Sequence, residues 1–565
     1  MVADKFVDTF SKHGQLTVPI VPTFGNNDFL PHNIFYPGPN KWLKAYANIW
    51  KRFIPEAQRH SFEFGGWFWV EVVPNHLAVF SLNTMYFFDR NAGVDGCAEP
   101  SEPGFAHMEW LRIQLQLLRD RGMKAILIGH VPPARTMSKQ NWDETCWQKY
   151  TLWLKQYRDV VTGSLYGHMN IDHFTLQDTK DIDIALGVDE TYRRGALSLE
   201  SEGDIDEELS ITSKEDYLQE LRVEWADLPG GAIKALFNTA KKHKNGKKKG
   251  DKFKKIGGKN AERYQVSLIS PSIVPNYFPT IRVFEYNITG LEKLPAWTES
   301  LEMKGVVPSL PEPIDEFEQE LQDEIEAFKK KNKRKHKKKK PKKPKDPNLI
   351  VPKDPPSGST PGPAYSPQQF TLTGYTQYFA NLTYLNNDIE DPDFEDNGWR
   401  DGDHADDKPK NKKPQPRDFN FEVEYSTFDD GKFKLKDLTV RHYLKLAYRI
   451  GRLTPGKGKQ SGRSIFDLWE SLFGEDESST SVFDKEFDED FGDDDDEAYD
   501  IDDDEDADWE DDCESEEDVS QAKKGHKKKG DKNKGNKKPR TNRSWITFLS
   551  RAFVSTVPTD ELEKM

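Results

Sequence analysis

Apolar residues in the first third of the chain follow two periods, one typical of strands and one typical of helices. The steps of three and four between Met108, Leu111 and Leu115 predict an amphipathic helix over 104–121. A second helix is expected after Asp143, because aspartate often caps helix N-termini. Strands are expected in four runs: LTVPIVPTF (16–24), HLAVFSLNTMYFF (76–88), KAILI (124–128) and 160–166. This alternation predicts a layered α/β fold.

Three of the expected strands end in a glycine that is followed by a possible metal ligand. Glycine lets the chain turn sharply, and strand ends are where sites form in α/β proteins. Imidazole nitrogens and amide oxygens can bind a divalent metal that also needs carboxylates. Each motif alone is weak, because Asn is common in turns and a lone His is common in cores, but together they favour a metal site. Its candidate residues are Asn26, Asn27, His130, His168 and Asn170.

Charge is concentrated in tracts that cannot form a core. Only 35% of the residues are hydrophobic and 32% are charged, so much of the 565-residue chain is not packed interior. Lysine runs occupy 241–259, 329–345 and 523–540, and 484–518 is almost continuous Asp and Glu. We interpret these tracts as disordered insertions between folded pieces. Phe253 is the single Phe, Tyr or Trp within the three lysine runs, too few to stack on successive bases, so no specific nucleic acid is expected.

The cysteines and the N-glycosylation sequons do not by themselves identify the cellular compartment of the protein. Cys97 and Cys146 could pair in an oxidising compartment or remain free thiols, and no CxxC pair occurs. No apolar run reaches the roughly 18 residues of a membrane helix, and the N-terminus lacks a signal-peptide pattern. Possible N-glycosylation sites are Asn287, Asn381 and Asn542.

The motif order GNND, GHVPP, GHMNIDHF resembles that of calcineurin-like metallophosphoesterases, and longer stretches resemble one branch, the fungal endopolyphosphatases. These stretches are FGNNDFLPHNIFYPGPN (24–40), FIPEAQRHSF (53–62), LAVFSLNTMYFFDRN (77–91), GHVPPAR (129–135), LYGHMNIDHF (165–174), LISPSIVPNYFPTIRVFEYN (268–287), FTLTGYTQYFANLTYLN (370–386), FEVEYSTF (421–428) and KLKDLTVRHYLKLAYRI (434–450). The resemblance implies a four-layer metallophosphoesterase-like β-sandwich flanked by helices, of the α/β class, with long disordered charged insertions.

The resemblance also implies a reaction, namely hydrolysis of internal phosphoanhydride bonds of long-chain inorganic polyphosphate. Two divalent ions (Mg, Mn, Co or Zn) are expected in the full-length enzyme, with Asn26, His130 and His168 binding the second. Asn170 stands where the superfamily has a histidine ligand of the first ion, and this amide favours Mg or Mn there. Asn27 stands where the superfamily has a general-acid histidine. A phosphate leaves a polyphosphate chain readily, so a phosphoanhydride substrate needs that acid less than an alkyl ester does.

Further residues in the matching stretches have both functional and ordinary interpretations. Arg59, His60 and His32 could contact a polyanion, although surface or packing roles are equally consistent with the sequence. Asp172 and His173 could orient His168, or they could simply close the loop.

The motifs that supply the superfamily's other metal ligands, Asp-x-His and Gly-Asp-x-x-Asp/Arg, should precede GNND. The 24 residues before Gly25 contain neither motif. We therefore expect an N-terminally truncated form that lacks the first strands, the bridging aspartate and the family's membrane anchor, and that has little activity as given. For the full-length enzyme, the resemblance implies a vacuole lumen or vacuole membrane location, a single-pass anchor and a possible homo-oligomer. The alternatives are a non-catalytic relative that binds polyphosphate or a partner, and a sphingomyelinase-like phosphodiesterase.

Matching stretches and charged tracts divide the chain into seven expected segments. They are the C-terminal part of the catalytic domain (1–182), a charged and largely disordered insert (183–262), a family-matching β segment (263–310), a Lys/Pro-rich disordered insert (311–365), a family-matching segment (366–455), an acidic then basic disordered tract (456–542) and a C-terminal tail (543–565).

Overall fold

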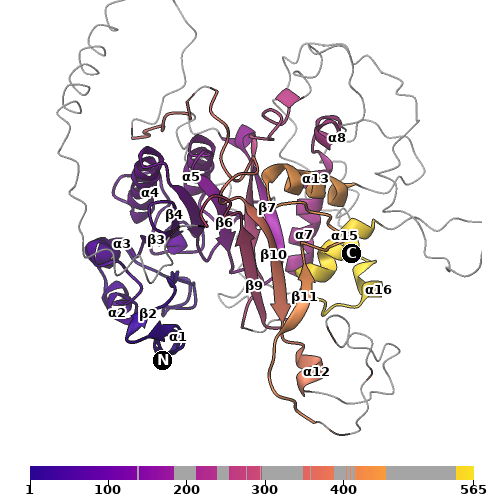
Figure 1. Cartoon of the computed structure of the whole chain (residues 1–565), viewed down its shortest axis with the longest axis horizontal. Helices are drawn as coiled ribbons and strands as arrows, with labels where there is room; N and C mark the ends of the chain where they lie inside the picture. The colour runs from indigo at the N-terminus through magenta and orange to yellow at the C-terminus, as the bar shows by residue number, and fades with distance from the viewer. Residues whose placement is uncertain are drawn as a thin grey trace, which may run out of the picture.

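The folded part of the chain is a mixed α/β structure with two sheets (Figure 1). The computed structural model describes residues 1–136, 139–182, 211–237, 253–274, 277–292, 348–356, 358–386, 415–452 and 542–565, with the single positions 294, 403, 408 and 413. The tracts 329–345, 484–518 and 523–540 and most of 241–259 lie outside these residues. Within the described ranges, no helix combines the length and apolarity needed to span a membrane.

The elements run in the following order along the chain. The first half holds α1 (Val2–Thr9), β1 (Ser11–Lys12), β2 (Gln15–Leu16), α2 (Lys41–Ile49), η1 (Glu56–Gln58), α3 (Arg59–Gly65), β3 (Phe68–Val73), β4 (Leu77–Ser81), η2 (Thr84–Tyr86), α4 (Pro103–Asp120), β5 (Lys124–Ile128), α5 (Glu144–Gln156), β6 (Val161–Tyr166), β7 (His173–Asp178), η3 (Thr179–Asp181), α7 (Ile211–Ala226), α8 (Gly230–Phe237) and β8 (Tyr264–Ile269). Then come β9 (Thr280–Tyr286), β10 (Leu372–Phe379), α12 (Leu382–Asn386), β11 (Glu422–Ser426), α13 (Val440–Gly451), α15 (Arg543–Ala552) and α16 (Thr559–Leu562).

The larger sheet has the strand order β3-β4-β5-β6-β8-β7. Its four central strands β4, β5, β6 and β8 are parallel, and β3 and β7 pair antiparallel at the two edges. The expected helix over 104–121 is α4, and KAILI is β5. Asp143 caps α5 as expected, because its side chain accepts a hydrogen bond from the amide of Thr145. The sequence therefore predicted the centre of this sheet and the helices that follow β4 and β5.

Alternate residues of the central strands enter two different hydrophobic clusters. Ala125 and Leu127 of β5 belong to the main core, which also contains Leu111 of α4. Ile126 lies in a second cluster with Phe370, which precedes β10. Because successive strand residues point to opposite faces, the sheet is covered by helices on one side and by the β9–β10 region on the other. This produces a layered arrangement of helices, large sheet and small sheet.

The run 16–24 is not the expected strand. Only Gln15–Leu16 is a strand, and it pairs with β1 in a short hairpin. The prolines Pro19 and Pro22 have no N–H to donate, so the run cannot pair along its length. Side-chain bonds hold it beside β4 instead, since Thr23 Oγ1 donates to the carbonyl of Leu82 at 2.9 Å.

A buried ion pair joins the two sheets. The small sheet has the antiparallel order β11-β10-β9. Arg282 of β9 donates to the carboxylate of Asp172, just before β7, at 2.6 Å, and their side chains are only 3% and 7% exposed. The hydroxyl of Tyr425 in β11 also donates to Asp172. The carboxylate thus links all three segments.

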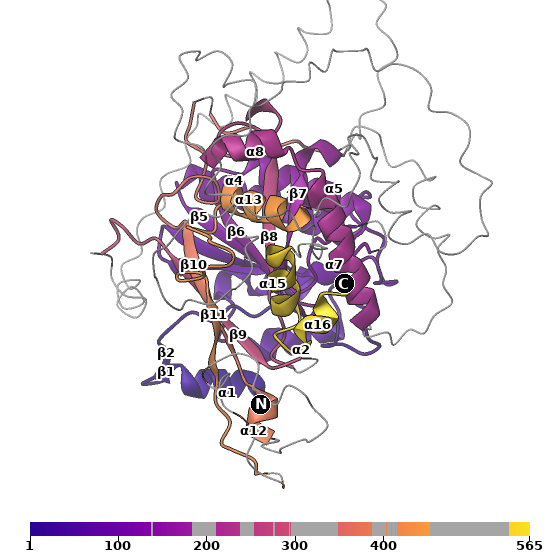
Figure 2. The same cartoon turned by 90° about the vertical axis from the view of Figure 1, so that its right-hand side faces the viewer.

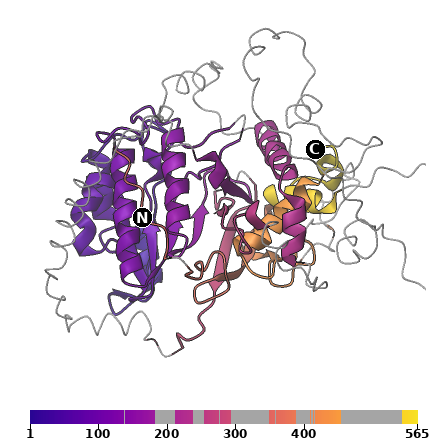
Figure 3. The ribbon, with the colours of Figure 1, turned by 90° about the horizontal axis from the view of Figure 1, so that it is seen from above.

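Helices from distant parts of the chain pack beside β7, and one of them lies in a segment that was expected to be largely disordered. α7 lies inside the expected disordered insert 183–262, yet its Trp225 stacks on Phe174 of β7 with ring centroids 4.6 Å apart. α15 lies in the expected tail 543–565, yet its Trp545 and Phe548 are buried. Figure 2 shows α7, α13 and α15 close together, and Figure 3 shows the C-terminal helices on the side of the molecule opposite to the N-terminal helices. Apolar side chains at helical spacing outweighed the charged flanks of these segments.

Replacing Arg282 by Met is expected to lower the free energy of unfolding by about 3–5 kcal/mol, because the buried Asp172 carboxylate loses its cation. The matched control is Arg121→Met, which removes an ion pair with Glu71 whose side chains are 33% and 18% exposed. That change should cost about 1 kcal/mol or less. Urea unfolding of both variants measures the difference, and equal losses would contradict the role assigned to the buried pair.

We expect the buried His107 to make the folded protein less stable in acid. It lies fully buried between the rings of Trp67 and Phe87, at centroid distances of 4.5 and 4.7 Å, and burial lowers its pKa to about 3. Below pH ~6.5 the unfolded chain binds a proton at this histidine and the folded chain does not, so stability falls as the pH falls. Between pH 7 and 5, His107→Leu should therefore lose about 2 kcal/mol less stability than the wild type. Urea unfolding at both pH values tests this, and parallel losses would refute it.

Candidate metal centre

Three side chains from distant parts of the chain converge at one edge of the large sheet. His130 Nε2 lies 2.8 Å from Asn26 Oδ1, and His168 Nδ1 lies 3.1 Å from the same oxygen. The two ring nitrogens are 3.3 Å apart. Asn26 precedes His130 by 104 residues and His168 by 142, so only the tertiary fold brings them together.

The two histidines meet because each follows a parallel strand. β5 and β6 are adjacent, so their carboxyl ends share one edge of the sheet. The two segments that follow these strands remain hydrogen-bonded to each other, because the amide of Gly167 donates to the carbonyl of His130 at 3.0 Å. His168 has a φ of +69°, a left-handed conformation that costs energy for a residue other than glycine. The fold sustains this strain at the point where the imidazole enters the centre.

Three buried phenylalanines hold the loop that carries Asn26. Phe24, Phe29 and Phe35 are each at most 1% exposed, and the rings of Phe29 and Phe35 have centroids 4.2 Å apart. The loop that these rings anchor can therefore carry polar side chains and still keep a fixed conformation, because its ends are buried. Asn26 reaches the histidines from this anchored loop, and not from the end of a strand.

Burial keeps both imidazoles neutral. It lowers the pKa of His130 to about 4. It is also the largest reason that the pKa of His168 lies well below its usual value, ahead of repulsion from His130, Lys139 and Arg90. A neutral imidazole keeps one proton-free nitrogen, which is the form that binds metal ions.

The donor atoms fit a single divalent ion. Separations of 2.8–3.3 Å match those of neighbouring ligands around an ion with bonds of about 2.1 Å, which lie about 3 Å apart. All three donors are neutral. In the part of the chain that the structure describes, no cluster of three or more His, Cys, Asp or Glu residues could hold a metal. Within the described residues, the three donors therefore form a neutral ligand set.

The two other asparagines of the motifs lie beside the centre. Asn27 is exposed, and its Oδ1 accepts a hydrogen bond of 3.2 Å from Asn26 Nδ2. Asn170 has a left-handed φ of +58°. Among the hydrogen bonds of the described residues, none joins Asn170 to Asn26, His130 or His168.

Asp172 and His173 do not orient His168. Asp172 binds Arg282 and Tyr425 in the contact between the sheets. His173 is buried, and its Nε2 lies 3.0 Å from the hydroxyl of Tyr217. The two side chains thus reach the small sheet and α7 and not His168, which corrects the orienting role, one of the two interpretations of the sequence.

Of the remaining candidates for substrate contact, His32 lies in the loop before α2, and Arg59 and His60 lie on α3. His32 and His60 are exposed. Arg59 lies in the first turn of α3, 3.9 Å from Glu56 and 3.8 Å from Glu63. These acids partly neutralise it, and none of the three residues hydrogen-bonds to the centre within the described part of the chain.

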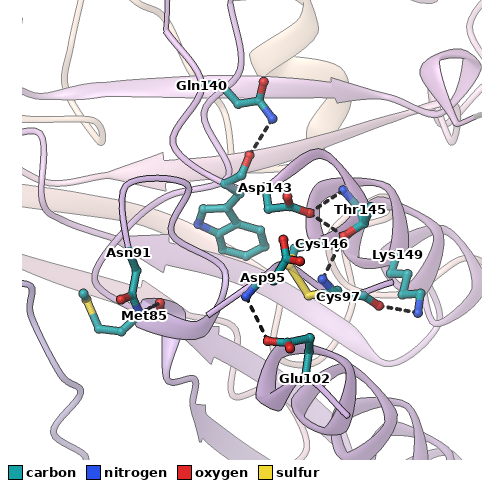
Figure 4. Close-up of a disulfide and its surroundings, with 11 residues drawn as sticks. Met85, Asn91, Asp95, Cys97, Glu102, Gln140, Asp143, Thr145, Cys146 and Lys149 are labelled. Atoms are coloured by element: carbon teal, nitrogen blue, oxygen red, sulfur yellow. Dashed lines mark hydrogen bonds between the residues drawn. A yellow bond between two sulfur atoms is a disulfide. The ribbon is translucent and has the colours of Figure 1, made fainter. Parts of the chain in front are cut away.

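Cys97 and Cys146 form a disulfide, the first of the two states that the sequence left open (Figure 4). It ties the loop before α4 to the first turn of α5. The same loop is held by Lys149, whose Nζ donates to the carbonyl of Cys97 at 2.6 Å. The disulfide and this hydrogen bond together fix the C-terminal end of the loop that begins after Phe88.

Of the three sequon asparagines, only Asn287 has an environment that suits a glycan. Asn381 is 3% exposed. Asn542 caps α15, and its Nδ2 donates to three carbonyl oxygens at the end of α13. The side-chain Oδ1 of Asn287 accepts a hydrogen bond from the amide of Thr289, and its side-chain Nδ2 has no partner among the described residues. Burial and helix capping thus correct the expectation for Asn381 and Asn542.

The structure adds residues that the sequence did not single out. Thr84 Oγ1 accepts hydrogen bonds from the amides of His130 and Val131, at 3.2 and 2.9 Å. The ring of Phe88 packs edge-on against His168, with centroids 5.2 Å apart. A Thr or Phe within an apolar run carries no local sign of such a role, because packing is the usual reason for its presence.

Two cations also lie near His168. Arg90 is exposed, Lys139 is partly buried, and both lower the pKa of His168. Their loops run side by side, because the amide of Asp89 donates to the carbonyl of Asn141 at 3.0 Å. Positive charge therefore flanks the neutral centre.

Comparison with known proteins identifies several close relatives. No protein-family model matches the chain. The chain is 50% identical to an endopolyphosphatase of Neurospora crassa, in an alignment that covers 100% of this chain and 79% of the relative. It is 33% identical to an endopolyphosphatase of Saccharomyces cerevisiae, over 80% of this chain and 68% of the relative. It is 30% identical to that of Yarrowia lipolytica, over 77% and 67%.

The glycines before the two histidines should differ in their tolerance of a side chain. A Cβ on Gly129 would lie 2.5 Å from Thr84 Cγ2 and 2.9 Å from the ring of Tyr166, whereas a Cβ on Gly167 would meet its nearest atom at 3.9 Å. Gly129→Ala should therefore cost about 1–3 kcal/mol of stability through overpacking, and Gly167→Ala much less. Urea unfolding measures both, and a larger loss at Gly167 would show that the packing argument is wrong.

Proposed function

Because this chain belongs to the fungal endopolyphosphatase family, we propose that it hydrolyses internal phosphoanhydride bonds of long-chain inorganic polyphosphate to give shorter chains. The observation that carries the proposal is the convergence of Asn26, His130 and His168 within a chain that is 50% identical to an endopolyphosphatase. A polyanionic substrate suits a centre of neutral donors, since an ion held there keeps its full positive charge for phosphate oxygens.

Asn26, His130 and His168 would hold a divalent ion, with Mg, Mn, Co and Zn as the candidates. When bound, such an ion polarises a phosphoryl oxygen and lowers the pKa of a coordinated water. The chain's own contribution is to keep the imidazoles neutral by burial and to fix their directions through Thr84 and Phe88. We assign Asn170 to the first of two ions, as the motif order suggests.

The residues around the centre support a phosphate-rich substrate. Arg90 and Lys139 lie close enough to repel a proton on His168, and the same charges would attract polyphosphate. Asn27 offers an amide where a general acid would otherwise stand. A departing phosphate is a stable anion and needs no proton from the enzyme, so an acid is dispensable for this bond.

We base proposals for the finer architecture and the location on the same family membership. We assign the two sheets and their covering helices to the four-layer sandwich of metallophosphoesterases. The layered arrangement and the positions of His130 and His168 after β5 and β6 support this assignment. The disulfide between Cys97 and Cys146 supports a location in an oxidising lumen, consistent with the vacuole.

The test is an assay of chain length. Long polyphosphate is incubated with the protein and Mn²⁺ or Mg²⁺, and its products are separated on gels, with EDTA as the control. Fragments of intermediate length that appear only with metal are expected, and they would overturn the low activity that the sequence alone led us to expect of the chain as given. Binding of polyphosphate without cleavage would instead identify a non-catalytic relative. Faster cleavage of an alkyl phosphodiester than of polyphosphate would favour the sphingomyelinase-like alternative.

His130→Ala and His168→Ala should each lower the rate of metal-dependent polyphosphate cleavage by about 100-fold or more, because each removes one of three donors. His76→Ala is the matched control, since His76 lies just before β4, at the end of the sheet opposite to the one that carries the centre. It should retain the wild-type rate. Equal loss in all three variants would place the reaction elsewhere.

A further inference from the structure

Asn33 makes two contacts with the asparagine of the candidate centre. Its side-chain Oδ1 accepts a hydrogen bond of 2.9 Å from Asn26 Nδ2. Its backbone amide donates to the carbonyl of Asn26 at 3.2 Å. The two residues thus close the loop on which Asn26 lies, and their side chains meet on the face of Asn26 opposite to the histidines.

The direction of the Asn26 amide decides whether it can be a ligand. Only Oδ1 has lone pairs to offer an ion, whereas Nδ2 would direct two hydrogens at it. The oxygen faces His130 and His168, and the nitrogen faces two acceptors, the side-chain oxygens of Asn33 and Asn27. Of these two, Asn33 makes the shorter bond and is partly buried, while Asn27 is exposed.

Asn33 is itself held rigidly. Its φ of +64° is left-handed, a conformation that asparagine tolerates better than most residues. Phe35, two residues later, is fully buried, and both its amide and its carbonyl bond to the side chain of Asn91 at 3.0 Å. An acceptor anchored in this way has a fixed position relative to Asn26.

We propose that Asn33 is a positioning residue, which holds the Asn26 amide in the orientation that presents Oδ1 to a divalent ion. This inference rests on the metal centre of the proposed function. Without the Asn33 acceptor, the Asn26 amide can rotate and turn its N–H groups toward the ring nitrogens, so one of three donors is lost for part of the time. Loss of an outer partner of this kind typically weakens metal affinity by about 10- to 100-fold.

A simple turn role for Asn33 makes a different prediction, and matched variants separate the two. Asn33→Gly keeps the left-handed backbone but removes the acceptor, whereas Asn33→Asp keeps an acceptor oxygen. Asn75→Gly is the control, because Asn75 is also left-handed, with a φ of +58°, and lies in the turn between β3 and β4. A turn role predicts tight binding in all three variants.

The experiment measures binding of Mn²⁺ to the full chain by electron paramagnetic resonance, with unfolding curves to verify folding. We expect Asn33→Gly to raise the Kd for Mn²⁺ by about 10- to 100-fold, with Asn33→Asp and Asn75→Gly within about threefold of the wild type or tighter. In cleavage assays Asn33→Gly should need more Mn²⁺ for half-maximal rate. If Asn33→Gly does not fold, Asn33→Ala, which also lacks the acceptor, replaces it.

Two results would overturn the inference in distinguishable ways. Wild-type affinity in the folded Asn33→Gly variant, with Mn²⁺ bound normally by the wild type, would refute the positioning role and leave the proposed function intact. Absence of Mn²⁺ binding by the wild type, together with no cleavage of polyphosphate, would refute the metal centre itself and the inference with it.

Discussion

The parallel hydrogen-bonded pairing of β5 with β6 is the constraint on which the candidate centre depends. It aligns Ile128 with Leu165, so the strands end together and the following glycines turn at the same edge. An antiparallel pair would have placed His130 and His168 at opposite ends of the sheet. β4, the parallel neighbour of β5, helps to position the third ligand, because the segment that leads to Asn26 is hydrogen-bonded to the residue after this strand.

Burial gives this centre its chemical character. The same packing that anchors the loops removes water from the imidazoles, which lowers their pKa values and keeps them neutral. The charges lie outside the ligand set, on Arg90 and Lys139. A neutral ligand set with flanking cations suits a polyanion. Its donors carry no negative charge that would cancel the positive charge of a bound ion or of the two cations.

The sequence predicted local features well where one period dominates. α4, β5 and the Asp143 cap follow from spacing and residue type, and the three ligand loops follow from their glycines. It failed where a second effect decided the outcome. Prolines prevented pairing in 16–24, and buried aromatics such as Trp225 order α7 inside a segment expected to be a charged, disordered insert. An orienting role at His168 was one of two interpretations of Asp172, but its carboxylate pairs instead with Arg282 of the small sheet.

By itself, the sequence determined which residues can act as ligands and which helices and strands carry most of them, because residue type and period are local properties. Its long matching stretches also indicated the family. The tertiary structure alone decided that Asn26 meets histidines 104 and 142 residues away, that Cys97 pairs with Cys146, and that Asn33 rather than a charged residue supports the Asn26 amide. These outcomes depend on side-chain direction and strand order, and neither can be read from neighbours along the chain.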